Sequence, residues 1–313
     1  MVMTDRLKER FVRDCKIPIK MYKEPYFTGR LELLDKYYGT LAKWQEFCAE
    51  VDKYPNEEEY FAVYNATKEA AMNFIKSREG WDAFNNLDMN QFAAKNKNFP
   101  SKDVFKPTNI GGAFVSIDIK KANFSVLNAY DPAIFGFVNT WEEFIHKFTD
   151  SDYITSSKYI REVIMGNCNP SRVITYEKHV TDGILTKLLD AGIDPMFIAF
   201  FSNDEIIVDV TSLDLPTIMN TITNVVKNAE VPLRVEYYRL IAVKKNNKII
   251  GYIRQMADGT YDFKCFNNQD LILVLRTLNG ESIKDSDLTF ENEGFLAKYI
   301  DTPKIDFITT YEG

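Results

Sequence analysis

An acidic side chain inside an apolar run is the first feature of this sequence that could do chemistry. Residues 114–125 read FVSIDIKKANFS, a stretch typical of a buried strand, with Asp118 in its middle. A carboxylate in a core strand is costly in free energy unless it is paired or holds a metal ion. Asp118 is therefore the first candidate for a functional residue.

A second acidic group lies between two further strand-like runs. Residues 197–210 predict a hairpin whose polar tip, residues 202–205, reads SNDE and carries Asp204 and Glu205. If this hairpin lies beside the strand of Asp118, the three carboxylates gather at one edge of a sheet. Such clusters hold two Mg²⁺ ions for nucleotidyl transfer. The alternative left open is that these acids lie at solvated strand ends.

Composition restricts the class of protein. The chain has 313 residues, of which 45% are hydrophobic and 27% charged, as in ordinary soluble globular proteins. No apolar run reaches the roughly 18 residues of a membrane span, and the charged first residues do not resemble a signal peptide. Four scattered cysteines and two histidines do not form a zinc set. We expect a reduced, cytoplasmic protein without membrane contact. A net charge of −7 argues mildly against nucleic-acid binding, which needs only a local basic face.

The elements that must position the acidic residues follow from periodicity and turn signals. The order is helices, strand, helices, hairpin, helix, strand, strand, which predicts an α+β fold: an antiparallel sheet with helices on one face, preceded by a helical N-terminal region. A Lys-, Asn-, Pro- and Gly-rich stretch at 94–112 predicts a connector. The expected helices cover 4–15, 29–53, 57 to about 80, 154–165, 171–190 and a segment opened by Asp214, and the later strands cover 233–243 and 249–255.

Several short motifs, in their order along the chain, resemble those of the palm and fingers of family B (α-like) nucleic-acid polymerases. The family's DxxSLYPS motif corresponds to 118–125, where Asp118 and Ser125 are retained. Its KxxxNSxYG motif corresponds to 158–166, where Lys158 and Gly166 are retained but the Asn, Ser and Tyr are replaced. Its YGDTDS motif falls on 201–206 and departs to SNDE, which is also similar to the His-Asp-Glu of family A. Residues 234–251 resemble the strand pair that ends the palm.

The resemblance implies a palm-type, ferredoxin-like sheet and a division into three regions. These are a helical region at 1–106, a palm at 107–255 with fingers helices inserted at about 140–191, and a small thumb-like region at 256–313. The implied activity is that of a compact polymerase adding nucleotides to a 3′ end. Its partners would be nucleoside triphosphates and a primer or template nucleic acid.

Site residues follow from the resemblance one by one. Asp118, Asp204 and Glu205 would be catalytic and, with Ile119, would form the site of two Mg²⁺ or Mn²⁺ ions. Phosphoryl transfer needs metal ions and cations placed around the reacting phosphate. The remaining implied contacts are Lys158, Arg161, Asn123, Ser125 and Gly166 for the nucleotide, and a basic patch of Lys244, Lys245, Lys248 and Arg254 for nucleic acid.

One departure from the family motif concerns the sugar. The family's Tyr under the sugar blocks a 2′-hydroxyl, and the corresponding residue here is Asn123. An amide is smaller and can hydrogen-bond a hydroxyl, so we expect ribonucleotides to be accepted at least as readily as deoxyribonucleotides. Phe124 would point to the opposite face if the strand continued through it.

Other departures leave alternatives open. No acidic motif set in residues 1–100 replaces the exonuclease domain that usually precedes a family B palm, so a protein partner could supply exonuclease or thumb functions. A template-independent nucleotidyltransferase is one variant, and the size and Lys/Asn richness suggest a viral origin, with host cytoplasm as the location. A palm-fold nucleotide cyclase and a non-catalytic accessory palm are the other two hypotheses.

Overall fold

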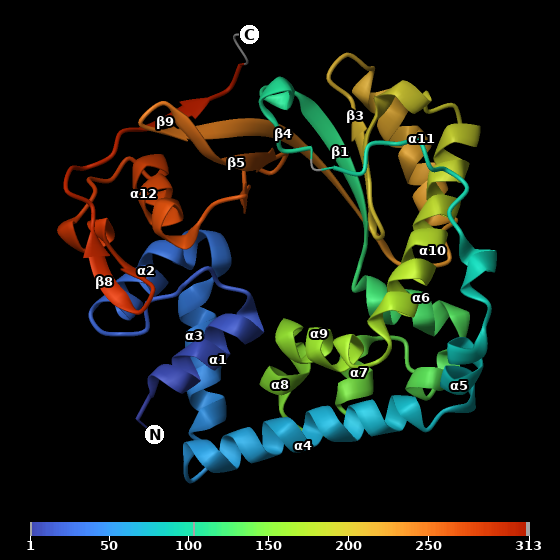
Figure 1. Ribbon diagram of the computed structural model, residues 1–313, viewed down its shortest axis with the longest axis horizontal. Helices are drawn as coiled ribbons and strands as arrows, with labels where there is room; N and C mark the ends of the chain where they lie inside the picture. The colour runs from blue at the N-terminus through green and yellow to red at the C-terminus, as the bar shows by residue number, and fades with distance from the viewer. Residues whose placement is uncertain (1, 103, 311–313) are drawn as a thin grey trace. The chain divides into compact units, whose positions relative to one another are not determined.

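A computed structural model describes residues 2–102 and 104–310 of the chain (Figure 1). It confirms the predicted α+β class, with helices first and an antiparallel sheet later in the chain. The chain divides into two compact units, which we call the first unit (1–65, 151–161 and 240–313) and the second unit (66–150 and 162–239). These limits differ from the three consecutive regions expected from the sequence. In the described part of the chain, no helix has both the length and the apolar character needed to cross a membrane.

The sheet of the second unit positions the acidic residues. Its strand order is β2-β3-β1-β4, and its neighbouring strands are antiparallel. With helices between β1 and β2 and between β3 and β4, this is the βαββαβ order of a ferredoxin-like sheet, as predicted. The strands are β1 (Ala113–Ile119), β2 (Ile198–Phe201), β3 (Glu205–Asp209) and the first part of β4 (Leu233–Lys245).

The longest helix of the second unit is α10 (Pro170–Asp190). It contacts β3, α6 and α11 and runs beside the strands in Figure 1. The side chains of Val115, Ile117 and Ile119 in β1 are almost fully buried, as an apolar strand in a core requires. The other α-helices lying wholly in this unit are α5 (Glu79–Asn86), α6 (Ala122–Tyr130), α7 (Trp141–Ile145) and α11 (Leu215–Lys227).

The first unit combines the N-terminal helices with the C-terminal strands. β5 lies next to β4, β6 pairs with β5, and β9 pairs with the second part of β4, so the region expected as a thumb contributes strands to this sheet. Three elements pass from one unit into the other: α4 (Glu57–Lys76), α9 (Lys158–Gly166) and β4. The unit's own elements are α1 (Asp5–Cys15), α2 (Tyr26–Tyr38), α3 (Thr40–Val51), α8 (Asp152–Ser156), β5 (Lys248–Met256), β6 (Tyr261–Lys264), α12 (Asn268–Leu278), β7 (Thr289–Asn292), β8 (Phe295–Lys298) and β9 (Ile305–Ile308).

Two predicted helices are each broken into two. The helix expected over 29–53 is interrupted at Gly39, whose φ of 59° lies in the left-handed region, where the chain turns from α2 to α3. The helix expected over 154–165 is interrupted at Ser157 between α8 and α9. The Ser157 hydroxyl donates to the buried Asp14 carboxylate at 2.8 Å and accepts from the backbone N–H of Ile160 at 3.1 Å. These tertiary and capping contacts favour a new helix start over a continuous helix.

The predicted strand over 114–125 is wrong beyond Ile119. β1 ends there and α6 begins at Ala122, after Lys121 with a positive φ of 50°. The Ser125 hydroxyl donates to the carbonyl of Lys120 at 2.6 Å and stabilises this turn. Phe124 is buried against Phe135 and Trp141 because it lies on a helix rather than on a strand.

Candidate functional site

Strand register brings the acidic residues together at one end of the sheet in the second unit. Asp118 on β1 lies opposite Glu205 on β3 and, on its other side, opposite Arg234 on β4. Residues directly opposite each other in antiparallel strands project from the same face. The predicted hairpin beside the Asp118 strand is therefore confirmed, and its turn carries Asp204 next to Glu205.

Asp118 is mostly buried and ion-paired. Its side chain is 20% exposed, and Arg234 donates to it from Nη2 at 2.8 Å. Burial raises the pKa of the Asp118 carboxyl, Arg234 acts to lower it, and the neighbouring carboxylates of Asp204 and Glu205 raise it further, so the pKa lies above its usual value. The three acidic residues are thus close enough to influence one another electrostatically.

Hydrogen bonds hold the other two acidic residues. The buried Ser116 hydroxyl donates to Glu205 Oε1 at 2.6 Å. Asp204 accepts from the Ser202 hydroxyl at 3.2 Å, and its backbone carbonyl accepts from the N–H of Ile119 at 2.9 Å. The turn of the hairpin is therefore joined directly to the end of β1, which is the role that the structure shows for Ile119.

α10 holds the same turn from the helical side. The Thr181 hydroxyl donates to the carbonyl of Asn203 at 2.6 Å, and Lys178 Nζ donates to the carbonyls of Phe201 and Ser202 at 3.2 and 3.0 Å. Burial lowers the pKa of Lys178 to about 8, although Asp182 acts to raise it. Apolar periodicity predicts the helix α10, but no local pattern indicates that its polar residues hold this turn.

Glu177 is a fourth acidic side chain near this turn. It is buried, and burial together with the charge of Asp204 raises its pKa to about 7. The sequence offered only one signal for it, an acidic residue within the predicted helix at 171–190. Its proximity to Asp204 depends on helix packing, which no local pattern reveals.

Asn123, the predicted sugar contact, and Ser125, another predicted nucleotide contact, lie on α6, directly after β1. Asn123 is partly exposed in the first turn, and its side-chain oxygen accepts from the N–H of Phe124 at 2.9 Å. Ser125 is 6% exposed and uses its hydroxyl within the β1–α6 turn. The structure therefore gives Ser125 a local stabilising role, while contact of Asn123 with a sugar stays a prediction.

The second motif is divided between the two units. Lys158 and Arg161 begin α9 in the first unit, whereas Gly166 ends it in the second unit. The helical conformation expected for this motif is present. Contact of Lys158, Arg161 or Gly166 with a nucleotide stays a prediction.

The predicted basic patch lies in the first unit and is partly engaged. Lys245 pairs with Asp270 at 2.5 Å and donates to the Tyr299 hydroxyl at 3.1 Å. Arg254 is only 5% exposed, and Lys244 lies opposite Asp306 in the sheet. Lys248 is exposed. Of the four, Lys248 is the side chain most accessible to a phosphate backbone.

The acidic residues have the donor chemistry of a magnesium site, but as they stand they do not form a complete one. Within residues 2–102 and 104–310, no group of three His, Cys, Asp or Glu side chains is arranged to hold a metal. Arg234 and Ser116 occupy oxygens of Asp118 and Glu205 instead. Mg²⁺ in phosphoryl-transfer enzymes commonly uses one or two carboxylates and takes its remaining oxygens from water and substrate phosphates. Asp118 and Asp204 fit that smaller donor set.

Comparison with known proteins gives no assignment: no protein-family model, curated protein sequence or solved structure matches this chain. Functional inference therefore depends on the residues of the site and on their geometry.

Proposed function

We propose that this protein is a metal-dependent nucleotidyltransferase that adds nucleotides to a 3′ end, as a compact polymerase does. The observation that carries the proposal is the register of two strands, β1 and β3. It places Asp118 opposite Glu205, with Asp204 in the adjoining turn, at one end of a ferredoxin-like sheet. Three neighbouring acidic side chains in a partly buried place are costly in free energy. Among these side chains Arg234 pairs with Asp118, and a metal cation would offset the remaining cost.

The chain's own residues would bind and orient the substrate. Asp118 and Asp204 would hold Mg²⁺ together with nucleotide phosphates, and the ion would supply neutralising charge for phosphoryl transfer. Arg234 is half exposed and pairs with Asp118. A guanidinium binds phosphate as well as carboxylate, so Arg234 would donate to a phosphate oxygen when Asp118 binds a cation. Thr181 and Lys178 would keep the Asp204 turn in position.

The test replaces the central carboxylate. Asp118→Asn retains the side-chain volume but removes the charge, and we expect incorporation of labelled nucleoside triphosphate to fall roughly 100-fold or more. The reaction contains Mg²⁺ and a primer, with and without template. The matched control is Asp190→Asn, an exposed carboxylate at the end of α10 in the same unit, which should leave incorporation unchanged. Equal activity of Asp118→Asn and the native chain would exclude the proposed site.

A non-catalytic palm is the second candidate, and one observation favours it. Asp118 and Glu205 find partners within the protein, in Arg234 and Ser116. This candidate predicts no incorporation by the native chain with Mg²⁺ or Mn²⁺, and no effect of either ion on its thermal unfolding. A cyclic nucleotide formed without primer would instead support a cyclase.

A further inference from the structure

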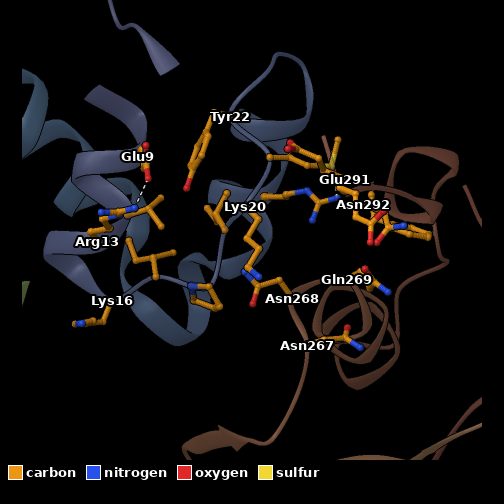
Figure 2. A pocket seen from close by; sticks show the side chains of 18 residues that line it. Glu9, Arg13, Lys16, Lys20, Tyr22, Asn267, Asn268, Gln269, Glu291 and Asn292 are labelled. Atoms are coloured by element: carbon orange, nitrogen blue, oxygen red, sulfur yellow. Dashed lines mark hydrogen bonds and ion pairs between the residues drawn. The ribbon is translucent and has the colours of Figure 1, made fainter. Parts of the chain in front are cut away.

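The first unit contains a cavity of about 820 Å³ that the proposed function does not use. Its walls come from three separate stretches of chain: residues 9–30, the start of α12, and β7 with the first residue of the turn after it. Figure 2 shows side chains from these stretches facing one another across the cavity. A volume of several hundred Å³ is typical of small-molecule sites.

The most unusual group in the cavity wall is the buried guanidinium of Arg30. Arg30 is only 6% exposed. Its Nη2 donates to the carbonyl of Thr289 at 2.7 Å and contacts the sulfur of Met21 at 3.1 Å. No Asp or Glu in the described chain forms an ion pair with it. Burial lowers the pKa of Arg30, and the charge of Asp287 compensates only in part. A buried guanidinium whose charge is compensated only in part is costly in free energy, so an anion entering the cavity would be stabilised there.

Two further features of the cavity favour an anion. α12 begins at the cavity wall with Asn268 and Gln269, so the partial positive charge of a helix N-terminus lies beside the cavity. Asp270 in the same first turn is paired with Lys245. Lys20 extends toward Asn268 in Figure 2 and is exposed to solvent. Arg30, Lys20 and the start of α12 thus supply positive charge from three independent elements.

The remaining wall suits the uncharged part of a nucleotide. Tyr22 presents an aromatic ring, and the amides of Asn268, Gln269 and Asn292 offer donors and acceptors. Negative charge is also present: Glu9 is paired with Arg13 at 2.5 Å, while Glu291 and Glu293 are exposed. The carboxylates of Glu291 and Glu293 would weaken the binding of an anion. Removing either charge therefore tests whether the ligand is negatively charged.

We infer that this cavity binds a nucleoside phosphate, with the phosphate held by Arg30, Lys20 and the N-terminus of α12 and the base against Tyr22 and the neighbouring amides. This site lies in the first unit and does not depend on the carboxylates of the second.

The experiment measures binding of AMP, adenosine and inorganic phosphate by titration calorimetry. It uses the full chain carrying Asp118→Asn, in EDTA, so that metal-dependent binding at the acidic site does not contribute. We expect AMP to bind more tightly than phosphate, and adenosine to bind least. Lys20→Ala should weaken AMP binding roughly tenfold by loss of a charge-assisted hydrogen bond, whereas Glu291→Gln should tighten it several-fold.

The matched control is Lys23→Ala, an exposed lysine three residues from Lys20 that does not line the cavity. It should bind AMP as the parent chain does, and all variants should unfold at the same temperature without ligand. Absence of AMP binding, equal losses in Lys20→Ala and Lys23→Ala, or tighter binding of adenosine than AMP would overturn the inference. None of these outcomes bears on nucleotide incorporation by the native chain with Mg²⁺, so the two proposals can fail separately.

Discussion

At the scale of single residues, the burial of Glu177 makes the stability of the protein depend on pH. Its side chain is buried on α10, and its pKa of about 7 exceeds the ordinary 4.5 because of burial first and the charge of Asp204 second. The folded protein therefore retains this proton at pH values where the unfolded chain has lost it. The contribution to stability is fully present below about pH 4.5 and is lost as pH rises to about 7.

Glu177→Gln removes the titrating group while keeping its shape. We expect the variant to match the native chain in free energy of unfolding at pH 4.5 and to exceed it at pH 8 by up to roughly 3 kcal/mol. Urea unfolding in EDTA at the two pH values measures this difference. The control Glu69→Gln, an exposed acid of α4 in the same unit, should change neither value appreciably. If the Gln variant loses as much stability between the two pH values as the native chain does, ionisation of buried Glu177 does not cause the pH dependence of stability.

At the scale of elements, Gly29 within α2 and Gly39 directly after α2 lead to opposite predictions for stability. Gly39 ends α2 with a φ of 59°, which an L-residue with a Cβ adopts only with strain, so Gly39→Ala should destabilise by about 1 kcal/mol. Gly29 lies within the helix, and a Cβ added there would meet no atom within 4 Å apart from its chain neighbours and the backbone of its own helix. Gly29→Ala should stabilise by roughly 0.5–1 kcal/mol, since alanine favours helix.

Denaturant unfolding of the two variants measures whether each substitution raises or lowers the free energy of unfolding. Each variant serves as the control for the other, because one adds a methyl group within α2 and the other adds a methyl group at its C-terminal end. A stabilising Gly39→Ala would show that α2 and α3 can join into the continuous helix that periodicity predicted.

At the scale of the whole molecule, sheet position should determine local stability. In the second unit, β1 pairs on both sides, with β3 and β4, and its residues 113–117 are all below 7% exposed. In the first unit, β7 and β8 form a two-stranded sheet with mostly exposed residues. Backbone amides exchange slowly in a buried strand that is hydrogen-bonded to a neighbouring strand on each side, because they are exposed only in large unfolding events.

Hydrogen exchange followed by mass spectrometry tests this order. Peptides covering 113–119 should exchange slowest and peptides covering 289–298 fastest, with the edge strand β2 between them. Comparable exchange of 113–119 and 289–298 would contradict the central position of β1.

Local features of the sequence determined several elements. The Asp214 side chain caps α11, the helix that the sequence predicted to begin at this residue, and Thr4 caps α1 at the start of the helix predicted over 4–15. The hairpin carrying Asp204 was predictable because two apolar runs flank a short polar turn. Each of these signals depends on neighbouring residues, and the physical interactions behind them span only a few positions.

Tertiary structure decided what surrounds the acidic residues. Strand register, not local pattern, places Arg234 opposite Asp118, and helix packing places Glu177 near Asp204. Likewise the contact of Ser157 with Asp14 ends a helix that periodicity would have continued. These contacts join residues far apart in the chain, and their free energies depend on burial and on neighbouring charges, which exist only once the chain has folded.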